Sequence, residues 1–239
     1  MIAGHSIWAV IPASGSGSRM GGDRPKQYLT LHHKTVLEHC LDRLLSHPQI
    51  EGAVLVLSEE DQYWEGLEYQ SEKPILIANG GEQRHHSVYN GLVQLQYRFG
   101  SESLVLVHDA ARPLVTHQEL SDVIAAASEH QAGAILALPV NDSLKLENDN
   151  FEIAASVSRD RLWRAQTPQA FYLLPLLNAL EKVVTQGLTI TDDASAIEQS
   201  GYSPKLVRGQ ATNLKITFAD DLALAEMIWL NQLDQQDNK

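Results

Sequence analysis

Small residues and two cations stand close together near the start of the chain, a combination that suits the binding of phosphates. The segment PASGSGSRM at 12–20 follows an apolar run that predicts a buried strand. Gly15 and Gly17 adopt unusual backbone angles readily and let N–H groups approach an anion closely. Arg19 and Lys26 add two positive charges. This pattern predicts a loop that binds a nucleoside triphosphate; the alternative is an ordinary glycine- and serine-rich turn with two surface cations.

Two better-known glycine loops do not fit this segment. A dinucleotide loop needs G-x-G-x-x-G and an acid about 20 residues further on. Met20 occupies the third glycine position, and the nearest acid, Glu38, lies in a helix-like stretch. A P-loop needs Gly-Lys-Ser/Thr after its first glycine, and none follows Gly15 or Gly17. A loop that ends in Arg-Met, with Pro-Lys-Gln just beyond, is instead similar to that of the sugar-nucleotide pyrophosphorylase superfamily.

The composition limits the partners. A chain of 239 residues, 44% hydrophobic and 20% charged, fits one large α/β domain at residues 1–239 and can bury a core without disulfides or metal. The net charge of −12 argues against a nucleic-acid polymer as partner. An acidic protein that binds anionic substrates must concentrate its cations locally, which draws attention to Arg19, Lys26, Arg112, Arg159 and Lys215.

The single cysteine and the lengths of the apolar runs bear on where in the cell the protein works. Cys40 has no cysteine to pair with and lies in a helix-like stretch, which suits a core thiol in a reducing environment. No apolar run approaches the length of a membrane span, and residues 1–5 do not resemble a signal peptide. We therefore expect a cytoplasmic enzyme without a membrane partner.

Apolar, β-branched runs alternate with amphipathic stretches along the first 140 residues. Strands are expected at Ile7–Ala13, Ala53–Leu57, Ile75–Ala78, Leu104–His108 and Ala134–Pro139. Helices are expected at Thr35–Ser46, Arg84–Tyr97 and Gln118–His130. This alternation predicts an α/β fold with a doubly wound, mostly parallel sheet. Ligands bind outside the carboxyl ends of such strands, where segments rich in Gly, Asp, Arg or hydroxyls follow four of the five expected strands.

The second part of the chain contains a different kind of segment. Residues 141–161 are polar and hold short alternating pieces at Ser143–Leu146 and Ile153–Val157, which predict a projecting hairpin; a disordered surface loop is the alternative. A return to the core follows near Trp163. Beyond it we expect helices at Leu173–Gln186, Thr191–Ser200 and Phe218–Asn231, and short strands at Lys205–Val207 and Leu214–Thr217.

Eight segments, in order and covering almost the whole chain, resemble the 2-C-methyl-D-erythritol 4-phosphate cytidylyltransferase family. They are PASGSGSRM at 12–20, PKQY at 25–28, GGEQRHHSV at 80–88, VHDAARP at 107–113, PVNDSLK at 139–145, RDRLWRAQTPQAF at 159–171, TDDASAIE at 191–198 and NLKIT at 213–217. The resemblance implies transfer of CMP from CTP to a sugar-alcohol phosphate in the non-mevalonate isoprenoid pathway, with Mg²⁺ as cofactor. It also implies a homodimer in which the arm at about 141–161 reaches the partner's site.

The resemblance assigns roles to residues around CTP. Arg19, Lys26 and Lys215 would stabilise charge on the phosphates during the transfer. The residues expected to bind CTP are Ala13, Ser14, Gly15, Ser16 and Gly17 at the triphosphate, and Gly80, Gly81 and Ser87 at the cytosine. Taken alone, the glycine pair is an ordinary strand-to-helix turn. The sequence leaves open whether Arg84 faces the ligand or the helix surface.

The same resemblance assigns the acceptor site. The residues implied are Asp109, Arg112, Ser143, Arg159, Thr167 and Thr191, with Asp109 also a candidate Mg²⁺ ligand beside the triphosphate. A structural salt bridge is the alternative for Asp109 and Arg112. Thr191 belongs to the substrate region that the resemblance implies, whereas Asp192 and Asp193 suit capping of the following helix as well as they suit substrate binding.

Some positions depart from the family pattern, and other functions compete with it. Ser14 stands where Ala is common, Glu82 where Asp is usual and Ser143 where Thr is usual, so altered affinity is expected at most. The adjacent histidine pairs at 32–33 and 85–86 are interpreted as non-ligands, since neighbouring side chains seldom meet at one ion. The competing functions are a cytidylyltransferase for another polyol phosphate, such as ribitol 5-phosphate, and a non-catalytic nucleotide sensor.

Overall fold

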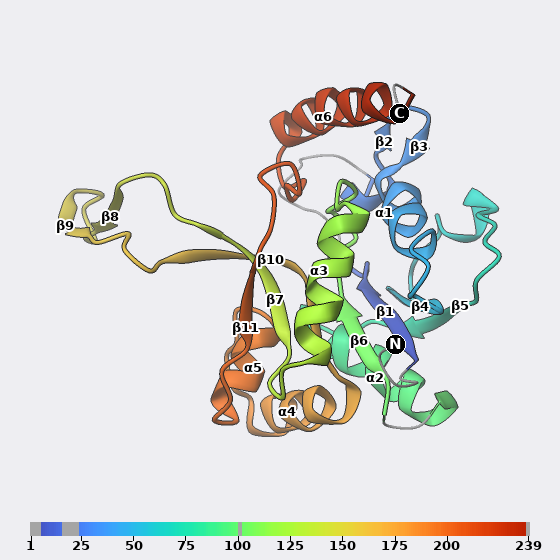
Figure 1. Cartoon of the computed structure of the whole chain (residues 1–239), viewed down its shortest axis with the longest axis horizontal. Helices are drawn as coiled ribbons and strands as arrows, with labels where there is room; N and C mark the ends of the chain where they lie inside the picture. The colour runs from blue at the N-terminus through green and yellow to red at the C-terminus, as the bar shows by residue number, and fades with distance from the viewer. Residues whose placement is uncertain (1–5, 16–23, 100–101, 238–239) are drawn as a thin grey trace.

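The centre of the molecule is a seven-stranded sheet with the strand order β11-β7-β10-β6-β1-β4-β5 (Figure 1). The computed structural model describes residues 6–15, 24–99 and 102–237. The strands are β1 (Ile7–Pro12), β4 (Gly52–Leu57), β5 (Ile75–Asn79), β6 (Leu104–Val107), β7 (Ala134–Pro139), β10 (Trp163–Tyr172) and β11 (Lys205–Arg208). The five strands expected in the first 140 residues are confirmed, each within one residue at either end.

The sheet is parallel except for β10. β1 pairs in parallel with β4 and β6, β4 with β5, and β11 with β7, whereas β10 runs antiparallel between β6 and β7. From the sequence alone, only a return of the chain to the core is predicted at this point. The polar residues Gln166, Thr167 and Gln169, with Pro168 among them, hide the apolar pattern, and the pairing with β7 shifts register between Ala165 and Gln169.

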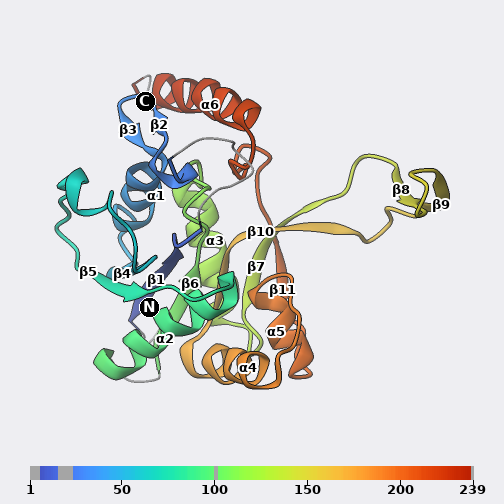
Figure 2. The same cartoon turned by 180° about the vertical axis from the view of Figure 1, so that it is seen from behind.

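Helices cover both faces of the sheet, which confirms the doubly wound prediction. Side chains of β1 alternate between two cores: Ala9 and Ile11 pack with α1 (Val36–Leu45) and α3 (His117–Ser128), whereas Trp8 and Val10 face the opposite side. That second core contains apolar residues of α2 (Arg84–Phe99), α4 (Leu173–Gln186) and α5 (Asp193–Gln199). α3 lies in front of the sheet in Figure 1 and α2 in Figure 2.

Capping residues explain the small boundary differences. Thr35 and Thr116 close capping boxes with Glu38 and Glu119, so α1 begins one residue later than predicted. The other short elements are β2 (Thr30–Leu31), β3 (Lys34–Thr35) and the 3₁₀ turns Lys26–Tyr28 and Glu65–Leu67.

Two expectations in the last part of the chain need correction. No strand forms at 214–217: the Ile216 N–H donates to the Ala111 carbonyl, but no sheet ladder follows, so the segment lies as a loop against the residues after β6. α6 (Ala219–Asp237) runs six residues beyond the expected end at Asn231. It packs against the β2–β3 hairpin, where Leu31, Ile216 and Ala225 share a small core (Figure 1).

The predicted hairpin at 141–161 is present. β8 (Leu144–Glu147) and β9 (Ile153–Val157) form an antiparallel pair that projects away from the main sheet (Figure 2). Its apolar side chains are unusually exposed: Leu146 is 56% exposed, Phe151 89% and Ile153 67%. Among the described residues, no helix is long and apolar enough to cross a membrane.

Candidate active site

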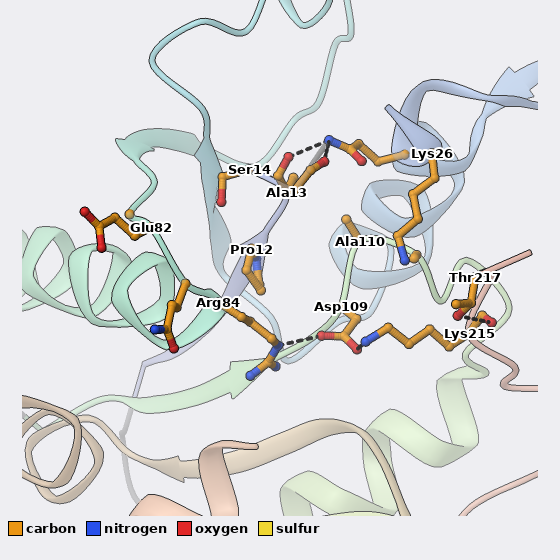
Figure 3. A pocket seen from close by; sticks show the side chains of 15 residues that line it. Pro12, Ala13, Ser14, Lys26, Glu82, Arg84, Asp109, Ala110, Lys215 and Thr217 are labelled. Atoms are coloured by element: carbon orange, nitrogen blue, oxygen red, sulfur yellow. Dashed lines mark hydrogen bonds and ion pairs between the residues drawn. The ribbon is translucent and has the colours of Figure 1, made fainter. Parts of the chain in front are cut away.

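A cavity of about 330 Å³ opens at the carboxyl ends of β1, β5 and β6 (Figure 3). Its volume falls in the usual range for small-molecule sites. Five chain segments meet there: the loop after β1, the 3₁₀ turn Lys26–Tyr28, the turn before α2, the segment after β6 and the loop before α6. Ser14, Lys26, Arg84, Asp109 and Lys215 contribute polar or charged side chains to its lining.

Gln27 holds the glycine loop in place. Its amide, 3% exposed, donates to the carbonyl oxygens of Ala13 at 2.6 Å and Gly15 at 3.2 Å. The Ala13 N–H is fixed in turn by the Val56 carbonyl. Gln27 has no role in the sequence prediction, although it follows Lys26 directly in the PKQY segment. Its function depends on contacts 12 and 14 residues away that no local pattern shows.

Two of the residues expected at the cytosine lie behind the cavity wall. Ser87 is fully buried; its Oγ is 2.8 Å from Ser14 Oγ and accepts the Gly81 N–H at 3.1 Å. A Cβ on Gly80 would collide with the Ser14 side chain. Gly80 and Ser87 therefore position Ser14 and Gly81, which do line the cavity, as do Ala13 and Gly15.

Asp109 lies at the centre of a cluster of cations. Arg84 Nε donates to its Oδ1 at 2.9 Å, and Lys215 Nζ contacts its Oδ2 at 2.8 Å. Arg112 Nε lies 3.8 Å from the same Oδ2. Figure 3 shows Arg84 and Lys215 approaching Asp109 from opposite sides. Arg84 therefore lines the cavity rather than the outer surface of α2, and Asp109 is the shared partner of Arg84, Lys215 and Arg112.

This arrangement keeps the carboxylate charged. Burial alone would raise the pKa of Asp109, but the charges of Arg84, Lys215 and Arg112 hold that pKa well below its usual range. Burial works against the charge of Arg84 as well, yet Asp193 and Asp109 raise the pKa of its guanidinium. The cavity lining thus contains two carboxylates, Glu82 and the ionised Asp109, against three cations, Lys26, Arg84 and Lys215.

Lys26 connects the loop after β1 to the loop before α6. Its Nζ donates to the Ile216 carbonyl at 3.0 Å, next to Lys215 in the chain. Both lysines line the cavity (Figure 3). The structure therefore brings together two of the three cations expected to act on the phosphates.

Thr167 and Arg112 support Asp109 from behind. Thr167 Oγ1 accepts the Asp109 N–H at 3.0 Å and lies 3.1 Å from His108 Nδ1, while His108 Nε2 is 2.9 Å from the Arg112 carbonyl. His108 is fully buried, which lowers its pKa to about 4, so it is neutral at pH 7 and its Nε2 acts as donor. Arg112 Nη1 donates to the Asn213 carbonyl at 2.8 Å. Thr167 and Arg112 do not line the cavity of this chain.

Three further candidates lie apart from the cavity. Ser143 and Arg159 are exposed on the arm, where Arg159 Nη1 bonds the Asn141 carbonyl. Thr191 is exposed just before α5, whose N-cap is Asp192. The remaining expected residues, Ser16, Gly17 and Arg19, lie outside the described part of the chain.

The cavity offers few protein ligands for a metal ion. Within residues 6–15, 24–99 and 102–237, no group of three or more His, Cys, Asp or Glu side chains is placed to hold one. Asp109 is ionised and faces the cavity, and each of its oxygens has more than one lone pair. One carboxylate completed by phosphate oxygens is a usual arrangement for Mg²⁺.

A glycine loop, paired lysines and an arginine–carboxylate cluster at the strand ends of a doubly wound sheet define the class of α/β nucleotidyltransferases. Comparisons with known proteins agree with this class and identify one family within it. The chain belongs to the 2-C-methyl-D-erythritol 4-phosphate cytidylyltransferase family, whose model matches residues 7–231.

Individual relatives match over nearly their full length. The chain is 46% identical to the 2-C-methyl-D-erythritol 4-phosphate cytidylyltransferase of Vibrio vulnificus YJ016, covering 97% of this chain and 98% of that protein. It is 45% identical to the enzyme of the same name from Pseudomonas aeruginosa, covering 91% and 93%. The crystal structure of the Francisella tularensis cytidylyltransferase superposes with a TM-score of 0.81 at 33% identity, covering 93% of this chain and 99% of that one.

Proposed function

We propose that this protein transfers CMP from CTP to 2-C-methyl-D-erythritol 4-phosphate. The products are 4-diphosphocytidyl-2-C-methyl-D-erythritol and pyrophosphate, and the reaction belongs to the non-mevalonate route to isoprenoids. The observation that carries the proposal is the cavity itself, where the glycine loop, Lys26 and Lys215 surround space for a triphosphate beside Asp109. Family membership supports the identity of both substrates.

In the proposed reaction an oxygen of the acceptor phosphate attacks the α-phosphorus of CTP. The bond between that phosphorus and the oxygen leading to the β-phosphate breaks, and pyrophosphate leaves with the electron pair. Such transfers depend on positioning and charge neutralisation rather than on a covalent enzyme intermediate. The backbone N–H groups of the loop at 13–17 would bind the triphosphate, with Arg19, Lys26 and Lys215 around the phosphates.

Asp109 has two roles in this proposal. In this structure it neutralises Lys215, which is 2.8 Å away and would exchange this carboxylate for a phosphate when substrate binds. With substrate present, Asp109 would accept hydrogen bonds from hydroxyl groups of the polyol, and Arg112 would contribute positive charge toward the incoming phosphate.

Magnesium is proposed as the cofactor. It would be held mainly by the triphosphate, with Asp109, the carboxylate at the centre of the cation cluster, as the protein ligand. When bound, it would neutralise charge that develops on the pyrophosphate group.

We propose further that the protein works as a homodimer through the arm. Ser143 and Arg159 flank the β8–β9 hairpin in the sequence and do not line the cavity of their own chain. The hairpin projects from the main sheet (Figure 1), and its exposed apolar residues suit a protein contact. Insertion of the arm into the site of a partner would bring both side chains to the acceptor. The cytoplasmic location and the single-domain organisation stay predictions from the sequence.

The proposal is tested by supplying CTP and Mg²⁺ with one acceptor at a time. Pyrophosphate release with 2-C-methyl-D-erythritol 4-phosphate supports it. Release with ribitol 5-phosphate alone would keep the phosphate chemistry but replace the acceptor. Tight CTP binding without release with either acceptor would favour a nucleotide sensor.

A further inference from the structure

A buried carboxylate outside the cavity lining contacts the active-site network. Asp193 is the first residue of α5, and its side chain is fully buried. Its Oδ2 accepts a hydrogen bond from Arg84 Nη2 at 2.9 Å, while its Oδ1 has no hydrogen-bond partner among the described residues. A buried carboxylate satisfied on one side only is costly for folding: burial raises the pKa of Asp193, and the ion pair with Arg84 opposes that rise and favours the charged form. This cost calls for a role other than stability.

Capping of α5 does not require this carboxylate. Asp192 is the N-cap: its Oδ1 accepts the Ser195 N–H, and its Oδ2 accepts from Gln169 Nε2 at 2.8 Å. Gln169 Oε1 also accepts the Ala194 N–H at 2.9 Å, which ties the start of α5 to β10. The helix end is therefore formed and anchored by Asp192 and Gln169.

Arg84 connects Asp193 to the cavity. Its Nη2 bonds Asp193 while its Nε bonds Asp109, so one planar guanidinium is held by two carboxylates on separate elements. A guanidinium fixed at two of its nitrogens has a defined orientation, which an ammonium group cannot reproduce. The result is a continuous series from Asp193 through Arg84 and Asp109 to Lys215.

We propose that Asp193 is a positioning residue for the acceptor: through Arg84 it fixes the Asp109 carboxylate in the orientation that receives the polyol phosphate. The inference rests on the proposed function, because the acceptor is identified there. Asp193 itself touches no substrate. Loss of its charge should loosen Arg84 and Asp109 and leave the glycine loop, on the other side of the cavity, unaffected.

The first test is Asp193→Asn, which removes the charge and keeps the shape. We expect KM for 2-C-methyl-D-erythritol 4-phosphate to rise about tenfold or more while KM for CTP stays within about twofold. Asp122→Asn, on the exposed face of α3, removes the same charge and should match the wild type. An acceptor KM within about twofold of the wild type in Asp193→Asn would overturn the inference.

The second test asks whether Asp193 acts through Arg84. Arg84→Lys keeps the positive charge but cannot bridge two carboxylates, so it should also raise the acceptor KM. Adding Asp193→Asn to Arg84→Lys should then change that KM by less than about twofold, whereas independent effects would multiply. Multiplying effects would overturn the inference.

Two other outcomes are also decisive. If Asp193→Asn does not fold, Arg84→Lys alone decides, and an unchanged acceptor KM in that variant would overturn the inference. A wild-type protein that releases no pyrophosphate with this acceptor would overturn the proposed function and this inference with it. Normal wild-type turnover with unaffected variants would overturn the inference alone.

Discussion

At the scale of single residues, the chemistry depends on cations that the folded protein already holds in place around the cavity. Lys215 is paired with Asp109, and Lys26 reaches the Ile216 carbonyl, so both are oriented before substrate arrives. Preorganised charges of this kind need little rearrangement when charge develops in the transition state.

Lys215→Ala should lower kcat by about 10²–10³-fold, because the loss of one charge aimed at the reacting phosphates typically has this effect. Steady-state pyrophosphate release measures it. Lys182→Ala, on the exposed face of α4, provides the control for loss of a lysine. A kcat close to that of the wild type would remove Lys215 from the catalytic residues.

His108 gives a prediction about stability and pH. Its pKa is lowered to about 4 by burial, whereas the same side chain in the unfolded state takes up a proton near pH 6.5. The unfolded state therefore binds more protons as the pH falls from 6.5 to 4, and the free energy of unfolding decreases by up to about 1.4 kcal/mol per pH unit from this group.

Urea unfolding between about pH 7 and pH 4.5 measures this dependence. His108→Gln keeps a donor near the Arg112 carbonyl and cannot titrate, so its stability should fall less steeply with pH. His33→Gln, at an exposed position, should retain the wild-type slope. Equal slopes for the wild type and His108→Gln would show that His108 is not held neutral.

At the scale of elements, close packing between the loop after β1 and the turn before α2 shapes the triphosphate site. An added Cβ at Gly80 would lie 2.8 Å from Ser14 Oγ and 3.1 Å from the Leu57 carbonyl. Gly80→Ala should therefore push the loop at 13–15 outward and raise KM for CTP by about tenfold. Gly66→Ala, where nothing lies within 4 Å, is the matched control. An unchanged KM for CTP would show that the loop adapts without loss of function.

The sequence predicts those elements whose hydrophobic pattern is local. The buried strands of the parallel sheet are continuous apolar runs, and the main helices show amphipathic periodicity. For most of these elements, the predicted ends therefore lie within one or two residues of the observed ends. β10 is missed because Gln166, Thr167 and Gln169 interrupt its pattern and make contacts up to 59 residues away. The alternation at 214–217 suggests a strand, but no neighbouring strand is placed to pair with it.

In the candidate site, too, residues within local motifs can be predicted from the sequence, whereas residues that act through distant contacts cannot. Motif positions identify Lys26, Asp109 and Lys215, which do line one cavity. The supporting residues Gln27 and Asp193 gain their roles from tertiary contacts, the latter with Arg84 across 109 residues, and a single sequence carries no signal for such pairs.

At the scale of the whole molecule, the arm provides a test of assembly. If it completes the partner's site, Lys26→Ala and Arg159→Ala should complement each other in a mixed dimer, because one of the two sites then contains an intact core and an intact arm. Hybrids purified through two different tags should show about half of wild-type activity per dimer.

The two parent homodimers serve as controls and should both be weak. Hybrids no more active than those parents would show that the arm acts within its own chain or not at all. Sedimentation of the purified hybrid confirms that the measured species is a dimer.

The measurement that tests the account most directly is pyrophosphate release from CTP and Mg²⁺ with 2-C-methyl-D-erythritol 4-phosphate, alongside ribitol 5-phosphate and a reaction without acceptor. We predict release that depends on the methylerythritol substrate, with little from ribitol 5-phosphate and none without acceptor. Release that is absent with 2-C-methyl-D-erythritol 4-phosphate, from protein that still binds CTP, would contradict the central claim.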